Sequence, residues 1–206
     1  MITISRNMVR RLRAVLRRSV LGIRHKGAIP PLVLHAEGTH LRAQYRYRDL
    51  AVEYVTPGCQ RQLDSLPVPL DALAELEGRD NGPVVLESIE PDRTVIRWED
   101  HGISRTREHP VTPLGKIEPF PDSPVTWTGI SADVLRALAE AAATCTEDSA
   151  RYALDCIQLR GTVHEIVATD GHQLLVRSGF GFPWDGDLLI KGSPTFACKA
   201  LNESFA

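Results

Sequence analysis

Residues 166–176 have the sequence IVATDGHQLLV, in which a polar turn separates two apolar runs. Gly171 follows Asp170 between these runs, which is typical of a tight turn that joins two β-strands. Asp170 and His172 allow three interpretations: a catalytic pair, half of a metal site, or a turn against which another molecule packs. We favour the turn, because Asp170 can cap its own backbone and no nucleophile is placed nearby by spacing.

The composition of the 206-residue chain is that of an ordinary globular protein, with room for one large domain or two small ones. No apolar run is long enough to span a membrane, so we predict no membrane association. The cysteines at positions 59, 145, 156 and 198 form no CxxC pair, which favours buried free thiols in a reducing, cytoplasmic compartment. No HxH or HxxxH spacing, P-loop or dinucleotide fingerprint occurs, so we predict no metal, cofactor or catalytic residue.

The charges are distributed unevenly although the net charge is only -2. No acidic residue precedes Glu37, whereas that segment contains seven arginines and one lysine: Arg6, Arg10, Arg11, Arg13, Arg17, Arg18, Arg24 and Lys26. A basic end on a nearly neutral chain indicates a surface for polyanions. The residues alone leave open a solvated amphipathic face, a targeting presequence and a helix that lies on anionic lipid.

Hydrophobic periodicity predicts two successive βαβββ units in the first 110 residues. The expected elements are a strand over 1–5, a helix from the N-cap Asn7 to about Leu21 that ends at Gly22, strands over 32–36, 41–47 and 51–55, a strand and short helix over 66–76, and strands over 84–88, 94–98 and 104–108. In the first helix we expect Met8, Leu12, Val15 and Leu16 to form the apolar stripe, with the arginines beside it.

Five prolines between Pro110 and Pro124 predict a linker, after which the pattern starts again. The expected elements are a strand over 125–128, a helix over 132–144 capped by Ser131, strands over 153–160, 163–168, 174–178 and 188–190, and a helix that begins at Ser193-Pro194. We expect Trp98, Trp127 and Trp184 to pack rather than to stack on bases.

The stretch 148–176, DSARYALDCIQLRGTVHEIVATDGHQLLV, resembles the middle domain of the bacterial DNA polymerase III β subunit, the sliding clamp. The family pattern is Arg-Tyr, a short spacer, Leu, a strand, and Ala-Thr-Asp-Gly-His-Arg-Leu. This chain supplies 151–154 (RYAL) and 168–174 (ATDGHQL). The first helix, the loop 21–24, Pro30, 66–76 and 118–121 resemble the first clamp domain more faintly.

The resemblance implies an α+β fold, the DNA-clamp or processivity fold built of repeated βαβββ units. It implies a clamp-like N-terminal domain over 1–121 and an incomplete middle domain over 122–206. The implied function is that of a non-enzymatic, nucleoid-associated processivity factor in DNA replication, which contacts the backbone of duplex DNA without reading its sequence. The residues expected to bind DNA are Arg10, Arg13, Arg17, Arg24 and Lys26.

The family also binds polymerases and repair proteins through a short peptide beside the Thr-Asp-Gly-His turn. Carried over position by position, the peptide-binding residues would be Leu154, Thr169, Gly171, His172, Gln173 and Leu174. Gln173 departs from the family's arginine, and Ala153 replaces a common aromatic residue. The third clamp domain is also missing, so a ring would need either a new homo-oligomer or a chain that supplies this domain.

Two alternatives to a working clamp therefore stay open. One is a peptide-binding module that keeps half of the groove and encircles nothing. The other is a truncated, non-functional clamp remnant, in which the second domain stops a little past its midpoint.

Overall fold

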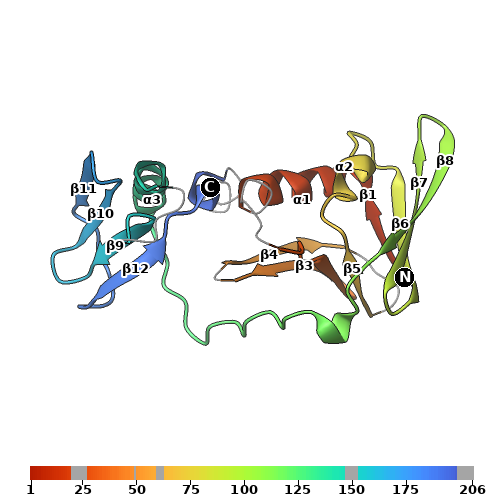
Figure 1. Cartoon of the computed structure of the whole chain (residues 1–206), viewed down its shortest axis with the longest axis horizontal. Coiled ribbons are helices and arrows are strands. Elements are labelled where there is room, and N and C mark those ends of the chain that lie inside the picture. Colours follow the sequence, from red (N-terminus) through yellow and green to blue (C-terminus); the bar gives the residue numbers. More distant parts are fainter. Residues whose placement is uncertain (20–26, 49, 59–62, 147–152, 199–206) are drawn as a thin grey trace. The chain divides into compact units, whose positions relative to one another are not determined.

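The computed structural model describes residues 1–19, 27–48, 50–58, 63–146 and 153–198 (Figure 1). The chain divides into two compact units. Unit 1 comprises Met1–Arg17 with Ile23–Ser123, and unit 2 comprises Arg18–Gly22 with Pro124–Ala206. No helix among the described residues combines the length and the apolar composition needed to cross a membrane.

Unit 1 contains two consecutive βαβββ repeats, as the sequence predicts. The elements of the first repeat are β1 (Ile2–Ser5), α1 (Arg6–Ser19), β2 (Leu32–Glu37), β3 (His40–Tyr47) and β4 (Leu50–Pro57). Those of the second are β5 (Asp64–Val68), α2 (Leu73–Leu76), β6 (Pro83–Glu90), β7 (Arg93–Asp100) and β8 (Ile103–Pro110). A short 3-10 helix, η1 (Leu114–Lys116), follows.

The two repeats of unit 1 exchange their first strands. The sheet orders are β4-β3-β2-β5 and β1-β6-β7-β8, and all the pairs are antiparallel. Ile2 therefore lies opposite Leu86, and Leu32 lies opposite Val68. Because each sheet contains a strand from the other repeat, neither repeat can complete its sheet alone.

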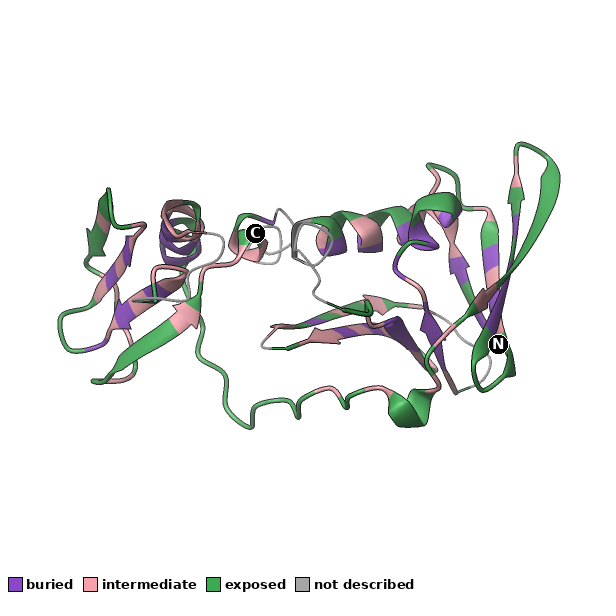
Figure 2. Ribbon diagram, viewed as in Figure 1, coloured by how far each residue is buried: buried purple, intermediate pink, exposed green. Residues whose placement is uncertain are grey.

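Unit 2 has a single four-stranded antiparallel sheet covered on one face by a helix. Its elements are α3 (Ala132–Thr144), β9 (Cys156–Arg160), β10 (Glu165–Thr169), β11 (Leu174–Ser178), β12 (Asp187–Lys191) and the 3-10 helix η2 (Pro194–Ala197). The strand order is β11-β10-β9-β12. Figure 2 shows the buried side of α3 against this sheet, where Leu138 and Ala141 pack on Ile157 and Ile166.

The N-terminus of α1 differs from the prediction. The helix begins at Arg6, and its N-cap is Ser5, whose Oγ accepts a hydrogen bond from the backbone N–H of Met8 at 3.2 Å. The backbone N–H of Asn7 instead donates to the carbonyl of Asp80 at 3.0 Å. The prediction of Asn7 as N-cap is therefore wrong. Asn7 lies inside the helix, and a distant loop, rather than a neighbouring side chain, accepts its backbone N–H.

The buried stripe of α1 also differs slightly. Val9, Leu12 and Leu16 are buried, whereas Met8 and Val15 are half-buried. The buried positions lie three and four residues apart, which is the helical period that we expected. The buried face is shifted by one residue around the helix. The predicted helix end near Leu21 and Gly22 lies outside the described residues.

The predicted strand over 125–128 is wrong, since this segment is irregular. Val125 is 99% exposed and Trp127 is 78% exposed, so the packing predicted for Trp127 is wrong as well. In unit 1 the corresponding strand β1 pairs with β6. Among the described residues of unit 2, no strand takes that position beside 125–128, and an extended segment without a ladder partner forms no sheet.

The other tryptophans do pack, as predicted. Trp98 is buried in unit 1, and Trp184 stacks on Phe182 with ring centroids 4.9 Å apart. Strand β9 begins at Cys156 instead of Ala153, because Ala153 has a φ of 51° and lies in a turn. Cys145 and Cys156 are half-buried free thiols, and burial raises the pKa of both; Cys198 is buried and free.

Candidate functional site

The first candidate surface is the turn between β10 and β11 in unit 2. Thr169 ends β10 and pairs with Leu174, which begins β11, so only four residues connect the strands. The Asp170 Oδ1 accepts backbone N–H groups from both His172 and Gln173 at 2.8 Å. Asp170 is therefore a cap for its own turn, as the sequence predicts.

Further hydrogen bonds fix the same turn. The Thr169 hydroxyl donates to the carbonyl of Gln173 at 2.6 Å and accepts the N–H of Gly171 at 3.0 Å. The Gln173 side chain donates to the Asp170 Oδ2 at 3.1 Å. The backbone hydrogen bonds from Gln173 and His172 lower the pKa of Asp170, which keeps this carboxylate ionised.

Leu154 and Gly171 place an apolar surface beside this turn. Gly171 has a φ of 91°, which a side chain would strain, and a Cβ atom built there would lie 3.7 Å from Leu154 Cδ1. Leu154 is half-buried, while Leu174 is 67% exposed. The structure thus gathers Leu154, Thr169, Gly171, Gln173 and Leu174 around one exposed turn, which we name the turn wall.

His172 also lies in the turn wall and is exposed. Its backbone N–H serves the turn, since it donates to Asp170. Because the Asp170 oxygens already accept three hydrogen bonds within the turn, they hold the turn together rather than orient an imidazole for catalysis. In the described part of the chain, no three His, Cys, Asp or Glu side chains are grouped as a metal ion would require.

A hollow in unit 2 lies elsewhere. It has a volume of about 620 Å³ and is lined by 128–131, 133 and 134 around the start of α3, by the end of β11 and by the aromatic segment 179–184. Sequence reasoning missed it, although the alternation of glycine and aromatic residues in 179–184 (GFGFPW) was a signal. No residue of the turn wall lines this hollow, so the turn wall is an exposed surface rather than part of the hollow.

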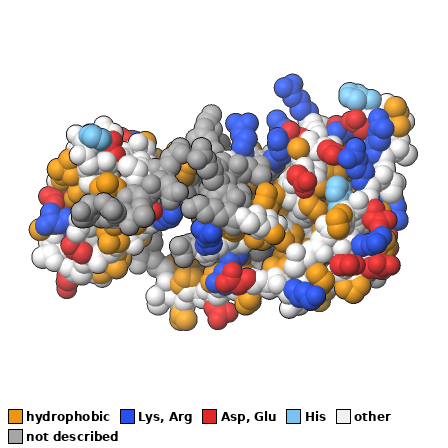
Figure 3. All heavy atoms as spheres, viewed as in Figure 1, with side chains coloured by type: hydrophobic (Ala, Val, Ile, Leu, Met, Phe, Trp, Pro, Cys, Tyr) orange, Lys and Arg blue, Asp and Glu red, His pale blue; other side chains and the backbone are white. Residues whose placement is uncertain are grey.

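The second candidate surface is the exposed side of α1 in unit 1. Arg10, Arg11 and Arg17 are exposed, and the helix has no acidic residue. Figure 3 shows Lys and Arg side chains that stand out along the edge formed by α1. Within the described part of the chain, Arg10 donates to the neutral Asn7 side chain at 3.2 Å, and that contact does not cancel its charge.

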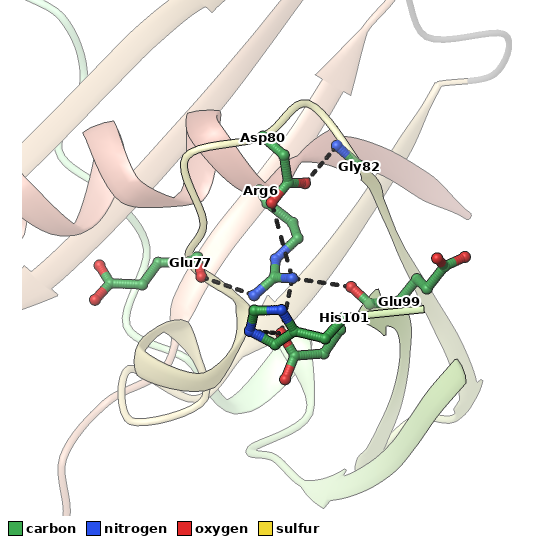
Figure 4. A network of polar contacts seen from close by, with 7 residues as sticks. Arg6, Glu77, Asp80, Gly82, Glu99 and His101 are labelled. Atoms are coloured by element: carbon green, nitrogen blue, oxygen red, sulfur yellow. Dashed lines mark hydrogen bonds and ion pairs between the residues drawn. The ribbon is translucent and has the colours of Figure 1, made fainter. Parts of the chain in front are cut away.

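Arg13 and Arg6 differ from these exposed arginines. Arg13 is half-buried, and its Nη1 lies 2.8 Å from Glu77 Oε1, so part of its charge is neutralised. Arg6 is almost buried within the polar network of Figure 4, where it contacts Asp100 and the carbonyls of Glu77 and Glu99. Of the predicted DNA-binding residues, Arg10 and Arg17 are the most available, while Arg24 and Lys26 lie outside the described residues.

Solved structures of other proteins share this architecture. No protein-family model matches the sequence, and no curated protein matches it. The sliding clamp of Bartonella birtlesii bound to griselimycin matches with a TM-score of 0.72 and 20% identity, over 98% of this chain and 56% of that one. The DNA polymerase III β subunit of Pseudomonas aeruginosa matches with a TM-score of 0.70 and 17% identity, over 98% and 56%.

The Helicobacter pylori β clamp bound to a DNA ligase peptide matches with a TM-score of 0.64 and 14% identity, over 99% of this chain and 57% of that one. The chain therefore has the fold of the bacterial sliding clamps and spans a little more than half of their length. At these identities the likeness establishes the fold, and the α+β clamp fold predicted from the sequence is confirmed.

Proposed function

We propose that this chain acts as a sliding-clamp-like, non-enzymatic protein that contacts the phosphates of duplex DNA through α1 and binds partner peptides at the turn wall. The observation that carries the proposal is the clamp fold over 98% of the chain together with the exposed turn wall at its Thr-Asp-Gly-His turn. The clamp fold supports the proposed class of function, and the two surfaces are where we propose that peptide and DNA bind.

The peptide part rests on the shape and chemistry of the turn wall. Leu174 offers an exposed apolar side chain, and the hydrogen bonds of Asp170 and Thr169 hold the turn in one conformation before any partner arrives. A preorganised surface loses little conformational entropy on binding. Because a clamp of the same fold is bound to a DNA ligase peptide, we propose a short peptide of a replication or repair protein as the ligand.

The peptide test is fluorescence anisotropy with a labelled peptide of the kind carried by DNA ligase. We expect Leu174→Asp to weaken binding at least about tenfold, because a charge would replace the exposed apolar contact. Leu189→Asp is the matched control, since Leu189 on β12 is 64% exposed and outside the turn wall. Equal affinities for both variants would contradict the turn wall as the binding surface.

The DNA part rests on charge. Arg10 and Arg17 are seven residues apart on one helix, which separates their Cα atoms by about 10 Å, and no acidic residue of α1 opposes them. Such a surface attracts phosphate without reading bases. We expect Arg10→Glu with Arg17→Glu to weaken duplex binding, and Arg93→Glu with Arg97→Glu on β7 to serve as the control.

A non-encircling peptide-binding module is the second candidate, because the turn wall lies wholly within unit 2 and α1 begins in unit 1. Retention on circular and linearised DNA of equal length separates the two. An encircling assembly slides off the DNA once the circle is cut, so its retention falls. A module that binds only peptides shows the same low retention on circular and on linearised DNA. Equal retention on circular and on linearised DNA would contradict an encircling clamp.

A further inference from the structure

Strand β11 forms one edge of the sheet in unit 2, and its apolar side chains are exposed. Among the described strands only β10 pairs with it, so the other side of its backbone has no ladder partner. Leu174 is 67% exposed and Val176 is 47% exposed, and Figure 2 shows most of the strand as exposed. An apolar edge of this kind is a template for another strand.

The other sheet edges are protected in the usual ways. Strand β8 carries Arg105, Arg107 and Glu108, while β4 ends in Pro57 and β12 carries Asp187. Charges and prolines at an edge oppose pairing with a further chain. Strand β5 contains a proline as well.

Strand β1 is an uncharged edge, but its two isoleucine side chains are covered. Ile2 is fully buried and Ile4 is 4% exposed. In β11 the single charged residue is Arg177, whose Nε lies 3.7 Å from Glu140 Oε2 of α3. Strand β11 therefore combines exposed apolar residues with a single charged residue, whereas β12, whose Leu188 and Leu189 are also exposed, carries a charge at each end.

We propose that β11 pairs antiparallel with β11 of a second copy of this chain, around a two-fold axis at Leu175. In this register Leu174 faces Val176 of the partner subunit, so apolar residues meet apolar residues on the same sheet face. A two-fold pairing uses the same strand twice and closes on itself. The proposed pairing uses Leu174 and Gln173, which also belong to the turn wall, and it does not involve the proposed DNA contacts of α1.

The charges favour this register over its neighbours. Gln173 would face Arg177 of the partner subunit, which brings that guanidinium toward the turn whose carboxylate is Asp170. The two-fold axis places the same attraction at both ends of the strand pair. A register centred on Val176 would instead place Arg177 opposite the half-buried Leu175 of the partner subunit, so that a charged residue would face an apolar one.

The test is sedimentation velocity of the whole chain over a wide range of concentrations. We expect the mass of the wild type to rise toward a dimer, and Val176→Lys to weaken this association about tenfold. Leu189→Lys is the matched control, because Leu189 is also exposed (64%, against 47% for Val176) on the same sheet face but lies on β12. Circular dichroism checks that both variants stay folded.

Cysteine cross-linking tests the register directly. A mixture of Leu174→Cys and Val176→Cys chains should form an intermolecular disulfide under mild oxidation, because facing residues of paired strands lie within disulfide range. A mixture of Leu189→Cys and Val176→Cys should form no more than the native cysteines give. A wild type that stays monomeric, equal effects of the two lysine variants, or equal cross-linking in both mixtures would overturn the proposal.

Discussion

Arg6, the first residue of α1, places its Nη1 2.9 Å from Oδ1 of Asp100, which ends β7 94 residues later. The same guanidinium donates to the carbonyls of Glu99 and Glu77 at 3.0 and 3.1 Å. Figure 4 shows how it joins the start of α1, the chain after α2 and the end of β7. Its side chain is only 11% exposed, which distinguishes it from the surface arginines.

We predict that Arg6→Met lowers the free energy of unfolding by about 2 kcal/mol, because the charged hydrogen bonds that Arg6 donates to Asp100 and to the carbonyls of Glu77 and Glu99 are lost. Urea denaturation measures this change. Arg93→Met is the control, since the Arg93 side chain is 52% exposed and pairs with Glu108 across the sheet surface. That variant should change stability much less, because solvent screens an exposed ion pair, and an equal loss in both would contradict the special role of Arg6.

Acidification should weaken unit 1 through His35. Burial lowers the pKa of His35 from its ordinary value of 6.5, and its Nδ1 lies 2.8 Å from Ser65 Oγ. The unfolded chain then binds more protons than the folded one below about pH 6.5, so stability falls as the pH drops through that region. Urea denaturation between neutral and mildly acidic pH should show this slope. In His35→Asn the slope should be smaller, and parallel curves would argue against His35 as its source.

The salt dependence of DNA binding should separate the arginines of α1. Each phosphate contact that is removed should lower the slope of log K against log salt by about 0.9. We expect this loss for Arg10→Ala and for Arg17→Ala. Arg13→Ala should change the slope less, because Glu77 already neutralises that side chain. Equal slopes for all three variants would contradict a DNA contact through the exposed side of α1.

Gly171→Ala should destabilise unit 2 by about 1–2 kcal/mol, because its φ of 91° strains a residue that carries a Cβ. Thermal unfolding followed by far-ultraviolet circular dichroism measures the loss. Gly129→Ala is the matched control, since a Cβ there meets open space and its φ is not positive. A similar effect of the two substitutions would mean that the turn tolerates another backbone conformation.

The candidate site was predictable where it depended on local chemistry. The sequence around Asp170 predicts a capped turn, and both backbone N–H groups that it accepts lie within three residues. The sequence could not show that Arg13 is paired, because Glu77 lies 64 residues away. The roles of these residues in binding peptide and DNA stay predictions.

The order and type of most elements follow from the amino-acid sequence alone, because helical and strand periods are local properties of the side chains. The sequence predicts the repeated βαβββ units and the Ser131 cap of α3, whose Oγ accepts the N–H of Val134. Which strands share a sheet depends on contacts between distant parts of the chain and is seen in the fold alone. Strands β1 and β5 exchange between repeats, and 125–128 stays irregular although its pattern resembles a strand. A strand exists only when its backbone donors and acceptors find a partner, and the partner is a property of the fold.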